Sequence, residues 1–434
     1  MTNPSLAARP TRATTVQKKV LLGGSVGQFI EFYDFTLYGL TAVIFSTHFF
    51  PQGDALTGLL VVFATFGVAF VCRPLGGLFF GALGDRIGRR RTLAITLFLV
   101  GGATTLIGLL PTFHQVGWLA PVLLVLCRLA QGFSAGGESV GGPSFVFEHA
   151  PVARRGFWIN ITLAATALPS VVAGGLILAL STGLSDAAFD SWGWRVPFLL
   201  ALPLSAFGVW IRSQTEESEV FKEAVAERGE EFSPIRESLA KNWRQMLQVI
   251  FVMGLTAMGF YFLSAYFVTY IQTAGNLSRE QALLTNALAM TSYAILLPVG
   301  GLIGDRVGRK PMIMIGSAVL AVISIPVFTM VTSGNFGLAL LGQAIFVVGL
   351  CLYGGGCYTF FVEIFNTRTR FTSTAMSYNV AYALFGGTAP FVGTALVGAT
   401  QVASSPGYYM AAAAVAVFLL IILTRVPETR GRQG

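Results

Sequence analysis

Two copies of a short basic loop, GALGDRIGRRRT at residues 81–92 and GLIGDRVGRKP at residues 301–311, decide the fold of this chain. Each copy follows a long apolar run and precedes another, so a tight basic turn joins two hydrophobic helices. Asp85 and Asp305 hold the same place in the two copies and lie 220 positions apart in a chain of 434 residues. This repeat predicts two similar halves.

The composition predicts an integral membrane protein. Apolar residues make up 54% of the chain, charged residues 11%, and the mean hydropathy is +0.69, so a water-soluble domain would lack polar surface to cover itself. A helix needs about 20 apolar residues to cross about 30 Å of hydrocarbon, and the chain holds about twelve such stretches. We expect these spans at residues 19–47, 57–83, 92–110, 119–147, 157–181, 195–211, 247–272, 282–304, 312–332, 335–363, 372–399 and 407–425.

The distribution of charge fixes the orientation and excludes a nucleic-acid partner. The net charge is +8, but most Lys and Arg residues fall on one side of the expected spans. This bias is the positive-inside rule, and it predicts an even number of spans with both termini in the cytoplasm. The GRRR run is then a topological anchor rather than a nucleic-acid patch.

The domain boundaries follow from this topology. Between Arg212 and Arg244 charges of both signs alternate at helical spacing, which is typical of a solvated linker. We expect a cytoplasmic tail at 1–18, a six-helix bundle at 19–212, a cytoplasmic linker at 213–245, a second six-helix bundle at 246–425 and a tail at 426–434. The four Cys and three His show no metal-ligand spacing, so we expect no metal, no cofactor other than protons, and no catalytic triad.

Charges inside the membrane distinguish the two halves. A shift of 220 positions superposes Arg73 on Tyr293, and a shift of 215 superposes Arg128 on Gln343 and Glu138 on Tyr353. Only the first half therefore carries ionisable residues within spans: Glu31, Asp34, Arg73, Arg128 and Glu138. Each would cost about 2.5 to 3.5 kcal/mol if left to lipid, so we expect them to face one another or a wet cavity.

Two interpretations of these charges stay open. Asp34 and Arg128 reach similar depth by rise per residue, so they can meet, and Glu31 and Asp34 at i, i+3 share one helix face. A buried ion pair that only locks the bundle is the simpler interpretation, but one pair would suffice for that. An excess acid indicates a titrating site. If an anionic solute competes for Arg73 or Arg128, Asp34 loses its partner and takes up a proton, and reciprocity makes this symport.

The chain resembles the major facilitator superfamily and its metabolite:proton symporter branch. The duplicated GxLxDRxGRR loop resembles the hallmark loop of that superfamily, and RLAQGFSAGGE at 128–138 is similar to the fourth-helix signature of that branch. Further similar motifs are EFYDFTLYG at 31–39, CRPLGG at 72–77, WGWRVPF at 192–198 and SYNVAYALFGGTAPF at 377–391. The resemblance implies an all-α membrane protein whose two six-helix bundles rock about a central site, in the plasma (inner) membrane of a bacterium.

Related carriers take proline and betaine, α-ketoglutarate, citrate or shikimate into bacteria with protons. We expect the proline/betaine carriers that end in a long coiled coil to match less well, because about nine residues follow the last span, fewer than a coiled coil of three heptads needs. The favoured function is proton-coupled import of a small organic acid, a di- or tricarboxylate or a cyclic carboxylate. The alternatives are a zwitterion symporter of the proline/betaine type, an exporter of the same fold, and a transporter-like sensor.

Roles for individual residues follow as hypotheses. For proton coupling we expect Asp34 and Glu31, with Arg128 as partner and Glu138 as relay. Arginine binds carboxylates in a bidentate manner, which makes Arg73 and Arg128 the anion anchors. The predicted substrate-binding set is Arg73, Arg128, Gln131, Tyr38, Tyr266, Tyr293, Tyr353, Tyr358 and Asn379.

A second predicted set forms a cytoplasmic gate. Its members lie where helices enter the cytoplasm, so that salt bridges among them close the inner side: Asp85, Arg89, Glu148, Arg155, Asp305, Arg309, Glu363 and Arg370. The expected partners are a small-molecule solute, protons and the lipid bilayer, and the expected state is a monomer. We expect no enzymatic activity.

Overall fold

A computed structural model describes residues 15–51, 53–87, 89–136, 141–213, 234–366 and 369–431. The backbone in these ranges is almost entirely helical, as the long apolar runs predict. Backbone polar groups cannot be left unpaired in hydrocarbon, and a helix satisfies them within its own segment. The predicted all-α class is therefore confirmed.

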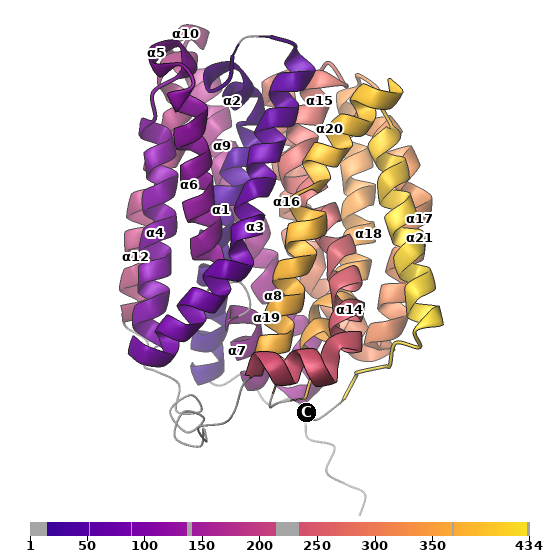
Figure 1. The fold of residues 1–434 in the computed structure, drawn as a ribbon. Helices are drawn as coiled ribbons and strands as arrows, with labels where there is room; N and C mark the ends of the chain where they lie inside the picture. Colours follow the sequence, from indigo (N-terminus) through magenta and orange to yellow (C-terminus); the bar gives the residue numbers. More distant parts are fainter. Residues whose placement is uncertain are drawn as a thin grey trace, which may run out of the picture.

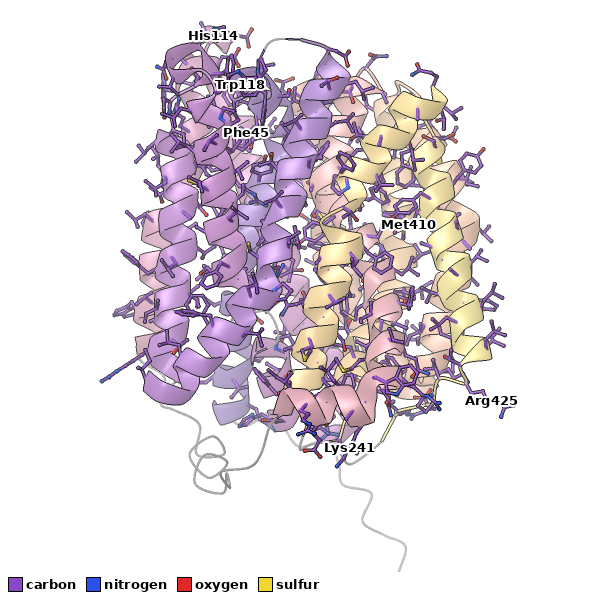
Figure 2. All side chains as sticks on the ribbon, in the orientation of Figure 1. Phe45, His114, Trp118, Lys241, Met410 and Arg425 are labelled. Atoms are coloured by element: carbon purple, nitrogen blue, oxygen red, sulfur yellow. The ribbon has the colours of Figure 1, made fainter. Side chains whose placement is uncertain are left out.

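The N-terminal half contains the helices coloured from indigo to magenta in Figure 1. Their bounds are α1 Thr15–Leu40, α2 Ala42–His48, α3 Ala55–Ile87, α4 Arg89–Leu109, α5 Phe113–Val116, α6 Leu119–Ala135, α7 Gly141–His149, α8 Arg155–Ala164, α9 Leu168–Gly183, α10 Asp186–Ser191, α11 Val196–Leu199 and α12 Ala201–Ser213.

The C-terminal half stands beside it, coloured from red to yellow (Figure 1). Its elements are α14 Pro234–Tyr261, the π-helical turn η4 Phe262–Tyr266, α15 Phe267–Thr273, α16 Arg279–Val307, α17 Arg309–Val331, α18 Phe336–Glu363, α19 Arg370–Ala381, the π-helical turn η5 Tyr382–Gly386, α20 Ala389–Thr400 and α21 Ser405–Leu423.

Each of the twelve predicted spans coincides with apolar helix. In the part of the chain that the structure describes, nine helices are long and apolar enough to cross a membrane, and two shorter apolar helices cover Ala94–Leu109 and Leu119–Ala135. The first predicted span is not one straight helix, because α1 and α2 meet at a bend of 60°. The count of twelve crossings and the cytoplasmic termini stay predictions. α14 begins at Pro234, ahead of the expected bundle boundary at 246, and residues 214–233 of the predicted linker lie outside the described residues.

Glycines allow α3 and α6 to pack backbone against backbone. A Cβ at Gly132 would strike the carbonyl of Ala69, and one at Gly136 would strike the carbonyl of Arg73. The two glycines therefore allow a close crossing of α3 and α6. It brings the two helices that carry Arg73 and Arg128 close together, and so it builds the frame of the central site.

Candidate functional site

A buried ion pair joins α3 to α1 at the centre of the N-terminal half. Arg73 Nη2 lies 2.6 Å from Glu31 Oε1, and the two side chains are 0% and 2% exposed. The Arg73 guanidinium also lies 5.2 Å from the ring centre of Phe35 and 6.0 Å from that of Tyr382. Because Tyr382 belongs to the C-terminal half, the ion pair stands at the interface between the halves.

Arg128 on α6 has only uncharged partners in the described part of the chain. Its Nη1 donates to Gln131 Oε1 at 2.8 Å and its Nη2 to the carbonyl of Phe66 at 3.3 Å. The guanidinium is fully buried and lies over the rings of Tyr38, at 4.4 Å, and Phe35, at 5.0 Å. A buried cation with neutral partners and aromatic walls is suited to hold an anionic group of a solute.

Asp34 is not paired directly with Arg128, so the predicted contact between them is wrong. Asp34 is 2% exposed, and no side chain among the described residues hydrogen-bonds to either of its carboxylate oxygens. It lines a cavity of about 10 Å³ between α1, α4 and α12. Glu31 and Asp34, predicted to share one helix face, have different neighbours. Side chains three positions apart diverge by about 60° around the helix axis, enough for Glu31 to meet α3 while Asp34 faces α4.

The C-terminal half contributes hydroxyl groups. Tyr293 Oη lies 3.0 Å from Tyr358 Oη, and Thr256 Oγ1 donates to Tyr358 Oη at 3.0 Å. The structure thus brings together two of the predicted site tyrosines. Asn379 is also buried, and its Oδ1 atom has no hydrogen-bond partner among the described residues.

Two other predicted tyrosines lie in different surroundings. Tyr353 donates to the carbonyl of Val252 at 2.8 Å, which is a packing role. Tyr266 stacks on Tyr270 at 5.0 Å and contacts Phe63 of the N-terminal half at 5.8 Å. Tyr266 therefore belongs to a contact between the two halves.

Sequence reasoning missed several residues at the centre. Tyr378 and Tyr382 stack at 4.0 Å, and Tyr261 contacts the rings of Phe66 at 5.5 Å and Phe70 at 5.2 Å. The i, i+4 spacing of the two tyrosines in SYNVAYALFGGTAPF was a signal for one shared helix face. Thr104 and Thr256 gave no such signal, because isolated threonines are common in apolar helices.

The predicted gate residue Asp305 bridges the two halves at the end that carries the basic loops. It accepts hydrogen bonds from the backbone N–H groups of Gly156, at 2.8 Å, and Phe157, at 2.9 Å, in the first turn of α8. Free N–H groups and the helix dipole make this terminus attractive to a carboxylate. Arg309 lies 2.9 Å from Asp305 and 3.1 Å from Glu363.

The remaining gate residues form a looser group. The guanidinium groups of Arg155 and Arg370, one from each half, lie 4.3 Å and 5.1 Å from the ring centre of Phe147. Glu148 is exposed. The side chains of Asp85 and Arg89, and the whole of Glu138, lie outside the described residues.

The C-terminal segment adds partners that were not predicted. Glu428 accepts from the backbone N–H groups of Arg309, at 2.9 Å, and Lys310, at 3.0 Å, and Thr429 Oγ1 donates to Glu363 at 2.9 Å. Glu428 and Thr429, in the segment predicted to be a cytoplasmic tail, thus contact the network of Asp305, Arg309 and Glu363. Sequence gave no spacing that points to this contact.

The halves also touch at the opposite end. The Arg279 guanidinium lies 4.8 Å from the ring centre of Phe189. A Cβ at Gly39, near the end of α1, would strike Ala265 in η4. The central residues therefore lie between two regions of contact between the halves. Among the described residues no group of three or more His, Cys, Asp or Glu side chains gathers as a metal site would require.

These observations define a membrane protein built from two packed bundles with a buried polar centre. The family model of the Major Facilitator Superfamily matches residues 24–379 and 249–434, so the chain belongs to this superfamily of transporters. The family, bacterial relatives that include an inner membrane transport protein, and the apolar helices confirm the predicted multi-pass location in the bacterial inner membrane.

Two bacterial transporters illustrate this similarity. The chain is 35% identical over 427 residues to a proline/betaine transporter of Escherichia coli, covering 96% of this chain and 84% of that protein. It is 34% identical to a citrate-proton symporter of Salmonella typhi, with 93% of each chain covered. The expectation that proline/betaine carriers match less well is wrong.

The fold itself is shared with a solved structure. The xylose transporter XylE of Escherichia coli, in a partially occluded inward-open conformation, aligns with 97% of this chain and 100% of its own, with a TM-score of 0.75 at 18% identity. At this level of identity the likeness establishes the fold alone.

Proposed function

We propose that the protein is a proton-coupled symporter that imports a small organic acid with one free carboxylate. The observation that carries the proposal is the unequal state of the two buried arginines. Arg73 is already neutralised by Glu31 at 2.6 Å, whereas the hydrogen-bond partners of Arg128 among the described residues are the uncharged Gln131 and a backbone carbonyl. One arginine is therefore available to bind one carboxylate.

The acidic side chains near Arg128 favour a solute with one carboxylate over a solute with two or three. Asp34 and Glu31 are both buried on α1, and a second carboxylate on the solute would add to their negative charge in a site of low polarity. Of the organic acids expected from the sequence, a cyclic monocarboxylate fits better than a di- or tricarboxylate. The hydroxyls of Tyr293, Tyr358 and Thr256 would bind uncharged polar groups of the same solute.

Proton coupling rests on Asp34. It is a buried acid, and no side chain in the described ranges hydrogen-bonds to its carboxylate, so its charge depends on the cations around it. When a solute carboxylate neutralises Arg128, the ionised form of Asp34 loses stabilisation and the residue takes up a proton. By reciprocity, protonation then strengthens solute binding, which is the condition for symport.

A zwitterion of the proline/betaine type is the second candidate. Phe66, Phe70, Tyr261 and Tyr382 form a connected set of rings at the interface between the halves, and such rings attract ammonium groups. In this case the solute carboxylate would still bind Arg128, and its cationic end would lie against the rings or Asp34.

Uptake into proteoliposomes with an imposed inward proton gradient tests both candidates. Cyclic monocarboxylates, citrate, α-ketoglutarate, proline and betaine would be offered one at a time. Accumulation of a monocarboxylate, lost in Arg128→Gln and retained in Gln343→Ala at the equivalent place in α18, supports the first candidate. Accumulation of proline or betaine alone supports the second. Solute leaving the vesicles against its gradient would instead support an exporter.

A further inference from the structure

Asp34 and Arg128 are close enough to influence each other but share no direct contact. Arg128 directs its two terminal nitrogens to Gln131 and to the carbonyl of Phe66, away from an ion pair with Asp34. Both side chains are almost fully buried. A hydrogen-bonded link between the proton site, Asp34, and the anion anchor, Arg128, therefore needs at least one bridging group.

The cavity beside Asp34 provides one end of such a bridge. Asp34 on α1, Thr104 on α4 and Ser205 on α12 are polar groups in its wall, and Ile30, Val100 and Leu204 are among its apolar lining. Its volume of about 10 Å³ is close to the smallest volume that holds one water, and a buried water needs two to four polar partners. Three such partners face this cavity.

Hydrogen bonds lead from the same cavity to Arg128. Thr104 Oγ1 accepts from Gln131 Nε2 at 2.8 Å and donates to the carbonyl of Val100 at 2.7 Å. Gln131 Oε1 accepts from Arg128 Nη1 at 2.8 Å. A hydroxyl hydrogen rotates to suit its partners, so Thr104 can donate to the cavity side in place of Val100 while its oxygen still accepts from Gln131.

Apart from Asp34, the residues that line the cavity carry no charge. The cavity walls contributed by α4 and α12 are Val100, Gly101, Thr104, Ala201, Leu204 and Ser205, none of which ionises. On α1 itself, Tyr33 lines the cavity but donates its hydroxyl to the carbonyl of Pro197. On α3, Arg73 is held by Glu31 of α1, and on α14 Tyr261 lies within electrostatic reach of Asp34. The Thr104–Gln131 path is therefore the hydrogen-bonded route from this cavity to a charged group.

We infer that Thr104 and Gln131 couple protonation of Asp34 to occupation of Arg128, through one water held in the cavity. With Arg128 unoccupied by solute, the Thr104 hydroxyl turns from the carbonyl of Val100 to donate to the water, and the water donates to ionised Asp34. Donors then run in one direction from Arg128 through Gln131 and Thr104 to Asp34, and each hydrogen bond strengthens the next. A solute carboxylate displaces Gln131 from Arg128, the chain loses its cationic end, and ionised Asp34 loses support. Gln131, predicted to bind substrate, becomes a positioning residue. This inference rests on the proposed proton symport.

The test compares Thr104→Val with Thr104→Ser and Thr105→Val. Thr105 is the adjacent threonine, and its hydroxyl donates to the carbonyl of Gly101 in the same helix. Solute affinity would be measured at several pH values in the purified full-length protein. Thr104→Val should reduce the ratio of affinities at low and high pH by about fivefold or more, the lower end of usual coupling between sites. Thr104→Ser and Thr105→Val should keep the wild-type ratio.

Ser205→Ala is a second variant, for the case that Thr104→Val does not fold. It removes another polar group of the cavity without touching Gln131, and it should lower the same ratio. A wild-type pH dependence in Thr104→Val, or in Ser205→Ala if only that variant folds, overturns the inference.

Asp34→Asn separates this inference from the proposed function. If Asp34→Asn abolishes the pH dependence but Thr104→Val leaves it intact, proton symport stands and only the bridge is wrong. If Asp34→Asn leaves the pH dependence intact, the proposed function itself fails.

Discussion

The two halves of this transporter share a duplicated loop but differ at mid-depth. Where the N-terminal half has Arg73 in an ion pair, the C-terminal half has Tyr293 in a hydroxyl cluster. Where α6 carries Arg128, α18 carries Gln343, which is buried and has no hydrogen-bond partner among the described residues. The N-terminal half therefore holds the groups that can bind a proton or an anion, and the C-terminal half presents uncharged groups to them.

The helix backbones also differ between the two halves. Of the described helices, those with π-helical turns, η4 and η5, belong to the C-terminal half, and η4 lies where Gly39 of α1 meets Ala265. π-helical turns often mark functional bends. The buried charges of the proposed site thus lie in one half, whereas the π-helical turns of the described helices lie in the other.

The largest effect is expected from breaking the ion pair. Arg73→Ala leaves Glu31 buried without its 2.6 Å partner, and removal of one member of a buried pair costs about 3–5 kcal/mol. The variant should unfold at a clearly lower temperature in detergent and lose transport. The double variant Arg73→Gln with Glu31→Gln should recover much of the stability. If Arg73→Ala melted at the wild-type temperature, the stability of the N-terminal half would not depend on its buried charges. That result would contradict the contrast between the halves.

A smaller effect is expected at the cytoplasmic gate. Asp305→Asn replaces a carboxylate that accepts from two backbone N–H groups of the other half, and hydrogen bonds to charged groups contribute about 1.5–3 kcal/mol each. Turnover should fall by about tenfold or more, while equilibrium solute affinity stays near that of the wild type. Asp85→Asn should act in the same direction.

Glu428→Gln is the matched control for the gate. Oε1 of Glu428 accepts from Arg309 and Oε2 from Lys310, so the amide keeps one of these two hydrogen bonds. The change does not touch α8 or the other half, so its turnover should change less. Normal transport rates in both Asp305→Asn and Asp85→Asn would refute the conformational role.

The smallest effect is expected in the hydroxyl cluster. Tyr293→Phe removes one 3.0 Å contact with Tyr358 and keeps the ring, and an uncharged hydrogen bond contributes about 1 kcal/mol. Solute affinity should fall only a few-fold, with no change in the dependence of transport on pH. A loss of pH dependence would move part of the proton chemistry into the C-terminal half.

Much of the fold was predictable from the sequence, because the membrane restricts backbone choices. Apolar runs of about 20 residues fix helices, and the duplicated loops at Asp85 and Asp305 fix the two halves. The bend after Leu40 and the π-helical turns were not predictable. They depend on how helices fit against each other rather than on a local residue pattern.

The candidate site was predictable in its members more than in its contacts. The cost of charge in hydrocarbon singled out Glu31, Asp34, Arg73 and Arg128. Which acid meets which arginine depends on small rotations of α1, and the sequence does not encode these in any visible spacing. The position of Thr104 in the site and the contact of Glu428 with Arg309 were not predictable for the same reason. Both depend on distant segments packing together.

The most direct test of the central claim is proton movement into proteoliposomes driven by an inward gradient of the transported solute. The proposal predicts acidification of the vesicle interior in the wild type, none in Asp34→Asn, and wild-type behaviour in Thr105→Val. Solute entry without acidification in the wild type, or equal acidification in Asp34→Asn, would contradict it.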